Sequence, residues 1–163
     1  MKKRALLLPL FILLYISGGV LWAQTWTVSH VSDGDTLVLD DGQKVRLIGV
    51  DTPEMSDMSR NRQSAVRYHV SADTVRQFAV KAKEFSREQV EGRQVRLEYD
   101  WQHSDKYGRT LAYVYREPDG LFLNAELLRQ GYAFAYRVFP FKYLEQFSEY
   151  SQEAQTQKKG LWK

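Results

Sequence analysis

The sequence contains no cysteine and little histidine. Among its 163 residues there are no cysteines and three histidines. Without cysteine the chain can form neither a disulfide nor a thiolate metal site. His30, His69 and His103 show no spacing typical of zinc ligands, so each is interpreted as a surface or loop residue. Zinc-dependent hydrolysis is therefore not supported.

The sequence also lacks internal repeats, low-complexity tracts and linkers, which indicates one domain. A long apolar run lies at the amino terminus, where MKKR is followed by ALLLPLFILLYI and then SGGVLWAQ. This order is typical of a secretory signal peptide. We expect residues 1–23 to be a signal peptide cleaved after Ala23, and residues 24–163 to be an exported domain, secreted or periplasmic. The alternative is an uncleaved membrane anchor, since residues 5–23 are just long enough to span a bilayer.

An excess of positive charge is missing from the exported part. The whole chain has 23 basic and 20 acidic residues, but three of the basic ones lie in residues 1–23, which contain no acidic residue. Residues 24–163 therefore carry equal numbers of both signs. Net charge gives no argument for nucleic-acid binding, which would need a local cluster of basic side chains.

Polar side chains are concentrated in the segment VSDGDTLVLDDGQKVRLIGVDTPE, residues 31–54. Acids, two hydroxyls and one arginine surround a predicted β-hairpin: Asp33, Asp35, Thr36, Arg46, Asp51, Thr52 and Glu54. The turn of this hairpin is expected at Asp41-Gly42, because alternating apolar runs flank it. Carboxylates and hydroxyls gathered in this way suggest a site for a hard metal ion. A DGDT segment is also common turn chemistry, so alone it leaves both interpretations open.

A two-residue turn would define the register of the hairpin and place Thr36 opposite Leu47. Asp35 and Asp51 then lie about three residue rows apart, roughly 10 Å. Sharing one cation would require the strands to bend. Gly34 and Gly49 stand where a bulge or a sharp bend can form.

The rest of the chain alternates between short strands and helices. Further strands are predicted at residues 25–31, 94–99 and 110–115. Helical spacing of apolar residues predicts helices at residues 73–91, 124–130 and 141–158, with Asp73 and Asn124 as N-caps. Leu161-Trp162 is expected to fold back on the core. Residues 55–72 are polar and aperiodic, so we expect a long mobile loop beside the acidic cluster.

These elements predict an α+β fold, a five-stranded OB-type Greek-key β-barrel with three helices. Four sequence blocks then occur in a characteristic order: DGDT at 33–36, VDTPE at 50–54, DKYGRTLAYVY at 105–115 and NAELLRQG at 124–131. In these blocks the chain resembles the staphylococcal nuclease (thermonuclease) family, over about residues 25–162. The resemblance implies the same fold and a calcium-dependent, sugar-nonspecific nuclease. Such an enzyme would hydrolyse phosphodiester bonds of DNA and RNA and leave 3'-phosphates.

The resemblance also implies roles for matching residues of the acidic hairpin. By the DGDT and VDT matches, Asp35 and Asp51 would be carboxylate ligands of a calcium ion. Thr52 would add its backbone carbonyl. By the VRL and TPE matches, Arg46 would hold the scissile phosphate and Glu54 would stand near the attacking water.

The later blocks imply the rest of the substrate site. By the KYGR match, Arg109 would be the second phosphate-binding arginine, with Lys106 and Tyr107 on a neighbouring phosphate. Tyr136, in GYAFAY, would line the nucleotide pocket. A second tyrosine expected soon after Tyr136 is missing, because the chain continues with Arg137-Val138-Phe139. Base recognition is therefore expected to differ from the family pattern.

These residue types suit phosphodiester hydrolysis. A cation and guanidinium forks offset the negative charge that grows on phosphorus, and a carboxylate can orient or deprotonate water. Simpler interpretations exist for single residues. Arg46 can be the solvent side of a half-buried strand, Glu54 a loop acid and Tyr136 part of the core.

Two functional classes follow from this pattern. The first is the calcium-dependent nuclease, a monomer with DNA and RNA as substrates and no obligate protein partner. Two carboxylates and one carbonyl form an open site, so calcium is expected to bind at about 10⁻⁴ to 10⁻³ M and magnesium to support turnover poorly. The second class is a non-enzymatic OB module that binds nucleic acid. The joint presence of Arg46, Glu54 and Arg109 favours the enzyme.

Overall fold

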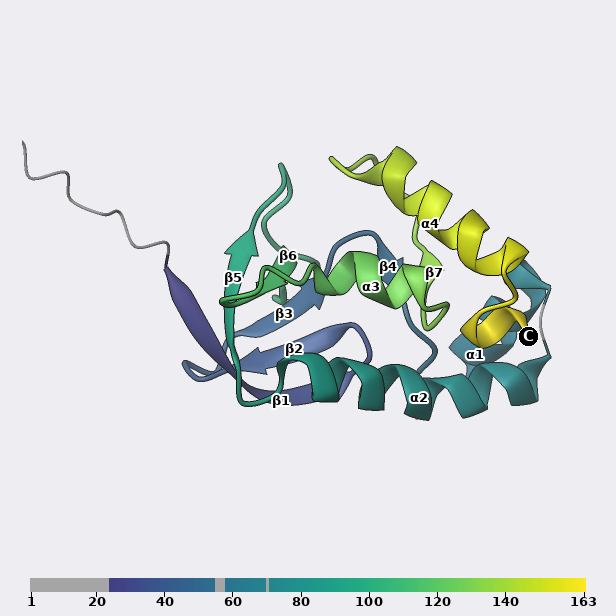
Figure 1. Cartoon of the computed structure of the whole chain (residues 1–163), viewed down its shortest axis with the longest axis horizontal. Coiled ribbons are helices and arrows are strands. Elements are labelled where there is room, and N and C mark those ends of the chain that lie inside the picture. Colours follow the sequence, from purple (N-terminus) through teal and green to yellow (C-terminus); the bar gives the residue numbers. More distant parts are fainter. Residues whose placement is uncertain (1–23, 55–57, 70) are drawn as a thin grey trace, which may run out of the picture.

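The computed structural model describes residues 24–54, 58–69 and 71–163. The predicted signal peptide lies outside the described residues. Within the described part, no helix is both long enough and apolar enough to cross a membrane. The described residues form a barrel at one end, with helices beside it and beyond it (Figure 1).

In the described residues, five strands close into a barrel in the order β1-β2-β3-β6-β5. They are β1 (Thr25–Asp33), β2 (Thr36–Leu39), β3 (Lys44–Leu47), β5 (Gln94–Glu98) and β6 (Thr110–Arg116). β3 and β6 run parallel, and the other neighbours are antiparallel. A separate pair joins β4 (Val50–Asp51) to β7 (Phe134–Ala135). The expected α+β fold with a five-stranded OB-type barrel is confirmed.

The β2-β3 hairpin differs from its predicted register by one residue. Thr36 pairs with Arg46, not with Leu47. The loop contains three residues instead of two, because Gly42 adopts a left-handed φ of 83° and adds a bulge. Residues opposite one another share a face of the sheet, so the observed register puts Thr36 and Arg46 together. The predicted register would have put Thr36 beside the core residue Leu47.

Three of the helices match the predicted ones. They are α2 (Ala72–Val90), α3 (Leu123–Arg129) and α4 (Leu144–Thr156). Figure 1 shows α2 running along the barrel and past its end, with α4 on the opposite side of the molecule. A short 3₁₀ turn, η1 (Gly160–Trp162), follows α4 and buries Leu161. Trp162 packs edge-on against Phe134, with ring centroids 5.6 Å apart, so the predicted folding back of this end is confirmed.

A fourth helix, α1 (Met58–Tyr68), occupies most of the predicted loop. The prediction of a loop over residues 55–72 is therefore wrong for residues 58–68, while residues 55–57 and 70 lie outside the description. Asn61 and Ala65, one turn apart, are buried side chains of α1. A narrow stripe that includes an asparagine has no apolar period, which is why the sequence pattern did not indicate this helix.

Both predicted helix caps are also displaced. The N-cap of α2 is Ser71, whose hydroxyl accepts from the Thr74 amide at 3.0 Å, instead of Asp73. The N-cap of α3 is Phe122. Asn124 lies inside the first turn of α3, because its side chain bonds β6 through the Val114 amide at 3.0 Å.

The core fills the barrel and the space between the barrel and the helices. Its largest fully buried side chains include Tyr113 from β6, Leu127 from α3 and Phe147 from α4. Burying one such side chain contributes roughly 1.5–3 kcal/mol. The core therefore couples the strands that carry the polar hairpin to the helices behind them.

Candidate active site

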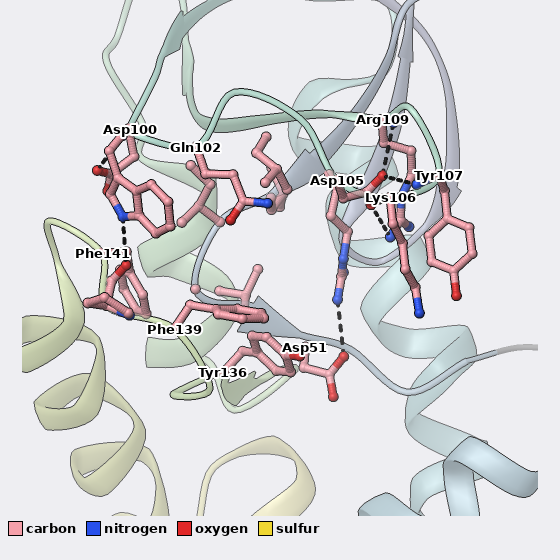
Figure 2. A pocket seen from close by; sticks show the side chains of 18 residues that line it. Asp51, Asp100, Gln102, Asp105, Lys106, Tyr107, Arg109, Tyr136, Phe139 and Phe141 are labelled. Atoms are coloured by element: carbon pink, nitrogen blue, oxygen red, sulfur yellow. Dashed lines mark hydrogen bonds and ion pairs between the residues drawn. The ribbon is translucent and has the colours of Figure 1, made fainter.

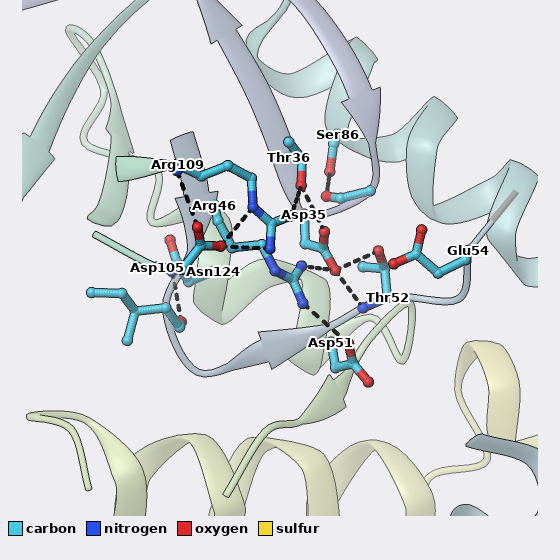
Figure 3. Close-up of polar contacts among 12 residues, drawn as sticks. Asp35, Thr36, Arg46, Asp51, Thr52, Glu54, Ser86, Asp105, Arg109 and Asn124 are labelled. Atoms are coloured by element: carbon cyan, nitrogen blue, oxygen red, sulfur yellow. Dashed lines mark hydrogen bonds and ion pairs between the residues drawn. The ribbon is translucent and has the colours of Figure 1, made fainter. Parts of the chain in front are cut away.

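Two carboxylates converge on one guanidinium at the end of the barrel (Figure 3). Arg46, from β3, places Nη2 3.1 Å from Asp51 Oδ1 and pairs through Nη1 with Asp35 Oδ2. The side chains are mostly buried, with exposed fractions of 11% for Arg46, 4% for Asp35 and 12% for Asp51. Buried charges of opposite sign attract strongly, and removal of one leaves the other uncompensated.

A sharp bend after β3 brings the two carboxylates together. Gly49 has a left-handed φ of 75°, and a Cβ at this position would lie 2.6 Å from the ring of Phe141. Only glycine fits such a bend. The chain then reverses into β4, which delivers Asp51 to the open end of the hairpin. The predicted bend at Gly49 is thus present, and it removes the separation that the strand rows alone would impose.

Asp35 is fixed by the residues around it. The amide and the hydroxyl of Thr52 donate to Asp35 Oδ2 at 2.7 and 2.8 Å, and Thr36 Oγ1 donates to Oδ1 at 3.2 Å. Ser86 of α2, fully buried, donates its hydroxyl to the Gly34 carbonyl at 2.5 Å. Sequence reasoning missed Ser86, because one serine in a helix carries no distinguishing signal. Thr52 therefore orients Asp35 through its amide and hydroxyl.

Arg109 is oriented by a carboxylate from its own turn. Asp105 Oδ2 accepts from Arg109 Nε at 2.7 Å and lies 2.7 Å from Nη2. Arg109 Nη1 reaches Thr36 Oγ1 at 3.4 Å, which links this arginine to the Asp35 network. Burial acts to raise the pKa of Asp105, but hydrogen bonds from the Arg109 amide and guanidinium and from the Tyr107 amide bring that pKa below its usual value. Asp105 is the first residue of the DKYGR motif and was not assigned a role from the sequence.

Glu54 lies outside any strand and is held through its backbone. Its amide donates to Asn61 Oδ1 at 2.9 Å, and Asn61 Nδ2 donates to the Glu54 carbonyl at 2.7 Å. Asn61, on α1, is 2% exposed. One side-chain amide thus satisfies both backbone groups of Glu54. Asn61 was missed because its surroundings were interpreted as a loop.

A second buried asparagine, Asn124, stabilises the barrel side. Its Nδ2 donates to the Ile48 carbonyl at 2.9 Å, and its Oδ1 accepts from the Val114 amide at 3.0 Å. The bond to Ile48 holds the chain immediately before the Gly49 bend. Asn124 stands first in the NAELLRQG block, so its position in the block was the signal available in the sequence.

A pocket of about 590 Å³ opens beside the guanidinium groups (Figure 2). Six of the predicted site residues line it: Arg46, Asp51, Lys106, Tyr107, Arg109 and Tyr136. Tyr107 is 73% exposed, and its ring centroid lies 5.0 Å from Lys106 Nζ. Tyr136 is half-buried, and its amide donates to the Gly49 carbonyl at 3.0 Å. The remaining three, Asp35, Thr52 and Glu54, lie on the far side of the Arg46 guanidinium from Arg109 in Figure 3.

Comparisons with known proteins identify the family of this chain. The model of the staphylococcal nuclease homologues matches residues 44–163. The thermonuclease of Staphylococcus hyicus is 38% identical over 144 residues, which is 85% of this chain and 76% of that protein. The chain belongs to the staphylococcal nuclease homologue family.

Other members of the staphylococcal nuclease homologue family are similarly related. The thermonuclease of Staphylococcus intermedius is 38% identical over 145 residues, covering 85% of this chain and 76% of that protein. Endonuclease YncB of Bacillus subtilis is 35% identical over 142 residues, covering 83% of this chain and 60% of that protein. The family match includes Arg46, Glu54 and Arg109 and begins after Asp35.

The donor set of this staphylococcal nuclease homologue fits a hard cation. Asp35 and Asp51 already share one positive charge, the Arg46 guanidinium, so their carboxylates are close enough to act on a common cation. In the described residues no three acidic, histidine or cysteine side chains gather as a metal site. Two carboxylates suit a calcium ion whose remaining ligands are backbone, water and substrate oxygens.

Proposed function

We propose that the protein is a calcium-dependent, sugar-nonspecific nuclease that hydrolyses phosphodiester bonds of DNA and RNA and leaves 3'-phosphates. Its family supports the phosphodiester hydrolase. The observation that carries the proposal is that the guanidinium groups of Arg46 and Arg109 line one pocket, which Asp51 also lines. Guanidinium forks match phosphate oxygens, and a pocket limits access of water to the charges.

Phosphate binding is the task of the two arginines. Arg109 is held on one side by Asp105, through Nε and Nη2, so its orientation is set before substrate arrives. Arg46 is paired with Asp35 and Asp51 in the free protein. A bound phosphodiester offers Arg46 a further anionic partner at the edge of the pocket. Donors positioned in advance lose little energy to reorganisation when charge develops on the phosphate oxygens.

Glu54 is assigned to the attacking water. Its backbone is held at both polar groups by Asn61, and its carboxylate comes two residues after Thr52, which binds Asp35. A carboxylate fixed in this way can accept a proton from water or orient the water for attack. The water oxygen forms a bond to phosphorus as its proton passes to Glu54. The bond from phosphorus to the 5'-oxygen of the next nucleotide breaks, and that oxygen takes a proton from solvent and leaves as a 5'-hydroxyl.

Asp35, Asp51 and the Thr52 carbonyl would hold the calcium ion, which supplies positive charge beside the phosphate when bound. Lys106 and Tyr107 are assigned to a neighbouring phosphate, and Tyr136 to the nucleotide. Lys106 and Tyr107 are exposed at the rim of the pocket, where a flexible substrate can reach them.

One digestion assay tests the proposal. Single-stranded DNA and RNA are incubated with residues 24–163 in calcium, in magnesium and in chelator, beside Arg109→Ala. We expect cleavage of both substrates in calcium, little in magnesium, none in chelator and strongly reduced cleavage with the variant. Products that a polymerase extends only after phosphatase treatment carry the expected 3'-phosphates. Binding without cleavage in calcium would identify the protein as a non-enzymatic OB module instead.

We also propose export, with cleavage after Ala23. The support is the order of charged, apolar and small residues in residues 1–23. Intact-mass measurement on protein recovered outside the cytoplasm should give a chain that begins at Gln24. Recovery in the membrane fraction with residues 1–23 attached would identify an anchor.

A further inference from the structure

Exposed aromatic side chains gather at one place on the described surface. Among the described residues, the strongly exposed large hydrophobic side chains other than Val66 and Val80 come from the two loops beside the pocket: Tyr99, Trp101, Tyr107, Val138 and Phe139. Trp101 is 64% exposed and Phe139 is 53% exposed. Exposed apolar area concentrated at a pocket is typical of a binding surface, whereas single exposed residues are common everywhere.

Trp101 is exposed and yet held in place. Its indole Nε1 donates to the Pro140 carbonyl at 3.0 Å, which joins the loop after β5 to the loop after β7. Its amide donates to Asp100 Oδ1 at 2.8 Å. Asp100 Oδ2 in turn accepts from the Lys142 amide at 2.8 Å and from the Tyr113 hydroxyl at 2.5 Å. A large ring fixed by such contacts loses little conformational entropy when a ligand stacks on it.

Tyr107 lies beside Lys106, whereas the other labelled aromatic groups of the pocket lie apart from Lys106 and Arg109. Figure 2 shows Lys106 and Arg109 on one side, Phe139 and Phe141 on the other, and Tyr136 beside Phe139. The Tyr136 and Phe139 rings are 6.2 Å apart between centroids. A ligand that fills the pocket must therefore have an anionic part and a flat apolar part. An unpaired nucleotide has both, since every base offers a π-face.

We propose that Trp101 and Phe139 form a base-stacking subsite for an unpaired nucleotide next to the one at Tyr136. This inference rests on the proposed function and adds to it a second nucleotide position, formed by residues that were assigned no role from the sequence. Bases in a duplex are already stacked and do not offer their faces to a side chain. The subsite therefore selects unpaired strands. The basic groups of the pocket favour this polyanion over an apolar protein segment as the occupant.

The test measures binding, so that it does not depend on cleavage. The full domain, residues 24–163, is titrated in chelator with a short single-stranded oligothymidylate and with a duplex of equal length. Trp101→Ala should weaken binding of the single strand roughly 5- to 100-fold, as for loss of one stacked base. Trp101→Phe should retain most of the affinity, since it keeps a ring. Phe139→Ala should weaken binding in the same direction.

Two controls separate stacking from a general effect. Val80→Ala removes an exposed apolar side chain on α2 that does not line the pocket and should leave binding unchanged. An oligonucleotide with one abasic position should lose affinity for the unaltered protein, and Trp101→Ala should show no further loss with that oligonucleotide. Thermal unfolding of each variant confirms that it is folded.

The outcomes distinguish the subsite from the nuclease proposal. Equal affinity of Trp101→Ala, Trp101→Phe and the unaltered protein would overturn the subsite, even if the protein cleaves DNA. Equal weakening of duplex and single-strand binding would also overturn it. A protein that cleaves neither DNA nor RNA in calcium, but whose oligonucleotide binding depends on Trp101, would retain the subsite and lose the proposed activity.

Discussion

The two halves of the active site are held by different means. On the barrel half, Thr36 and Arg46 are cross-strand partners, and Arg46 is ion-paired with two buried carboxylates. On the helical half, Glu54 lies outside the strands, and two hydrogen bonds join its backbone to Asn61 of α1. The barrel half thus belongs to a hydrogen-bonded ladder of strands. The backbone of Glu54 is instead hydrogen-bonded by the side chain of Asn61.

This difference predicts that substitutions in the two halves have different effects, on binding and stability in one half and on turnover in the other. A ladder distributes strain over many hydrogen bonds and packed side chains, so its geometry survives the loss of one contact. Glu54 lies outside the ladder, and loss of the Asn61 side chain removes the hydrogen bonds that it makes to both backbone groups of Glu54. Changes on the barrel half should therefore alter stability and phosphate or metal binding, and changes on the helical half should alter turnover.

The largest effect is expected when the groups with a proposed role in the reaction are removed. Glu54→Gln and Arg109→Ala should each lower kcat/KM by on the order of 10²-fold or more, since loss of a positioned donor or base costs roughly 3 kcal/mol of barrier. Steady-state kinetics at matched concentration of folded protein give the values. Near-normal activity in either variant would disprove its assigned role.

Loss of Asp35 should change two properties of the barrel half, its stability and its response to calcium. Asp35→Asn leaves the buried Arg46 with one carboxylate and should cost about 3 kcal/mol of stability. The proposed calcium site predicts that calcium raises the melting temperature of the unaltered protein, and Asp35→Asn should abolish that rise. Calorimetric scans with and without calcium measure both. A calcium-dependent rise that persists in Asp35→Asn would exclude this carboxylate as a ligand.

The two buried asparagines offer a matched comparison of the halves. Asn61→Ala and Asn124→Ala each leave buried backbone groups unpaired and should each cost about 1–3 kcal/mol of stability. Asn61→Ala should in addition lower kcat roughly tenfold, because a carboxylate that drifts by about 1 Å loses its alignment with water. KM should change little in both variants.

The contrast between the two halves would be contradicted if Asn61→Ala and Asn124→Ala lowered kcat equally. A kcat for Asn124→Ala as low as that of Asn61→Ala would show that both halves position the reacting groups through general stability alone. Asn61→Asp keeps an acceptor for the Glu54 amide but removes the donor to its carbonyl. The kcat of Asn61→Asp should therefore lie between those of Asn61→Ala and the unaltered protein.

The smallest effect concerns acid pH and Asp105. The pKa of Asp105 in the folded protein is lower than its usual value of 3.8, so its ionised form favours folding. That contribution is complete above pH 4 and is lost as the pH falls below 3.8 through the folded-state pKa. Asp105→Asn should therefore show a weaker fall in unfolding free energy between about pH 4 and pH 2, measured by denaturant titration. An unchanged slope would show that the Arg109 pair contributes nothing there.

Local patterns in the sequence determined the five barrel strands, three of the helices and the residue types of the site, but not the short β4-β7 pair. Alternation in TLVL and KVRL defines which side chains enter the core, and the DGDT, VDTPE and DKYGR blocks contain all the predicted site residues except Arg46 and Tyr136. The predicted register of the β2-β3 hairpin was still wrong by one residue. The turn alone permits two loop lengths, and only the burial of Leu47 on one face and the ion pairs of Arg46 on the other decide between them.

The tertiary structure decided which groups meet. Asp51 reaches Asp35 because Gly49 bends the chain against Phe141, and Glu54 is anchored because α1 packs on α2 and presents Asn61. Trp101 is fixed by a carbonyl 39 residues further along the chain. Such contacts join one polar side chain to a distant backbone group and have no period in the sequence. Hydrophobic periodicity predicts which face of a helix or strand is buried, but it does not predict which residues that face contacts.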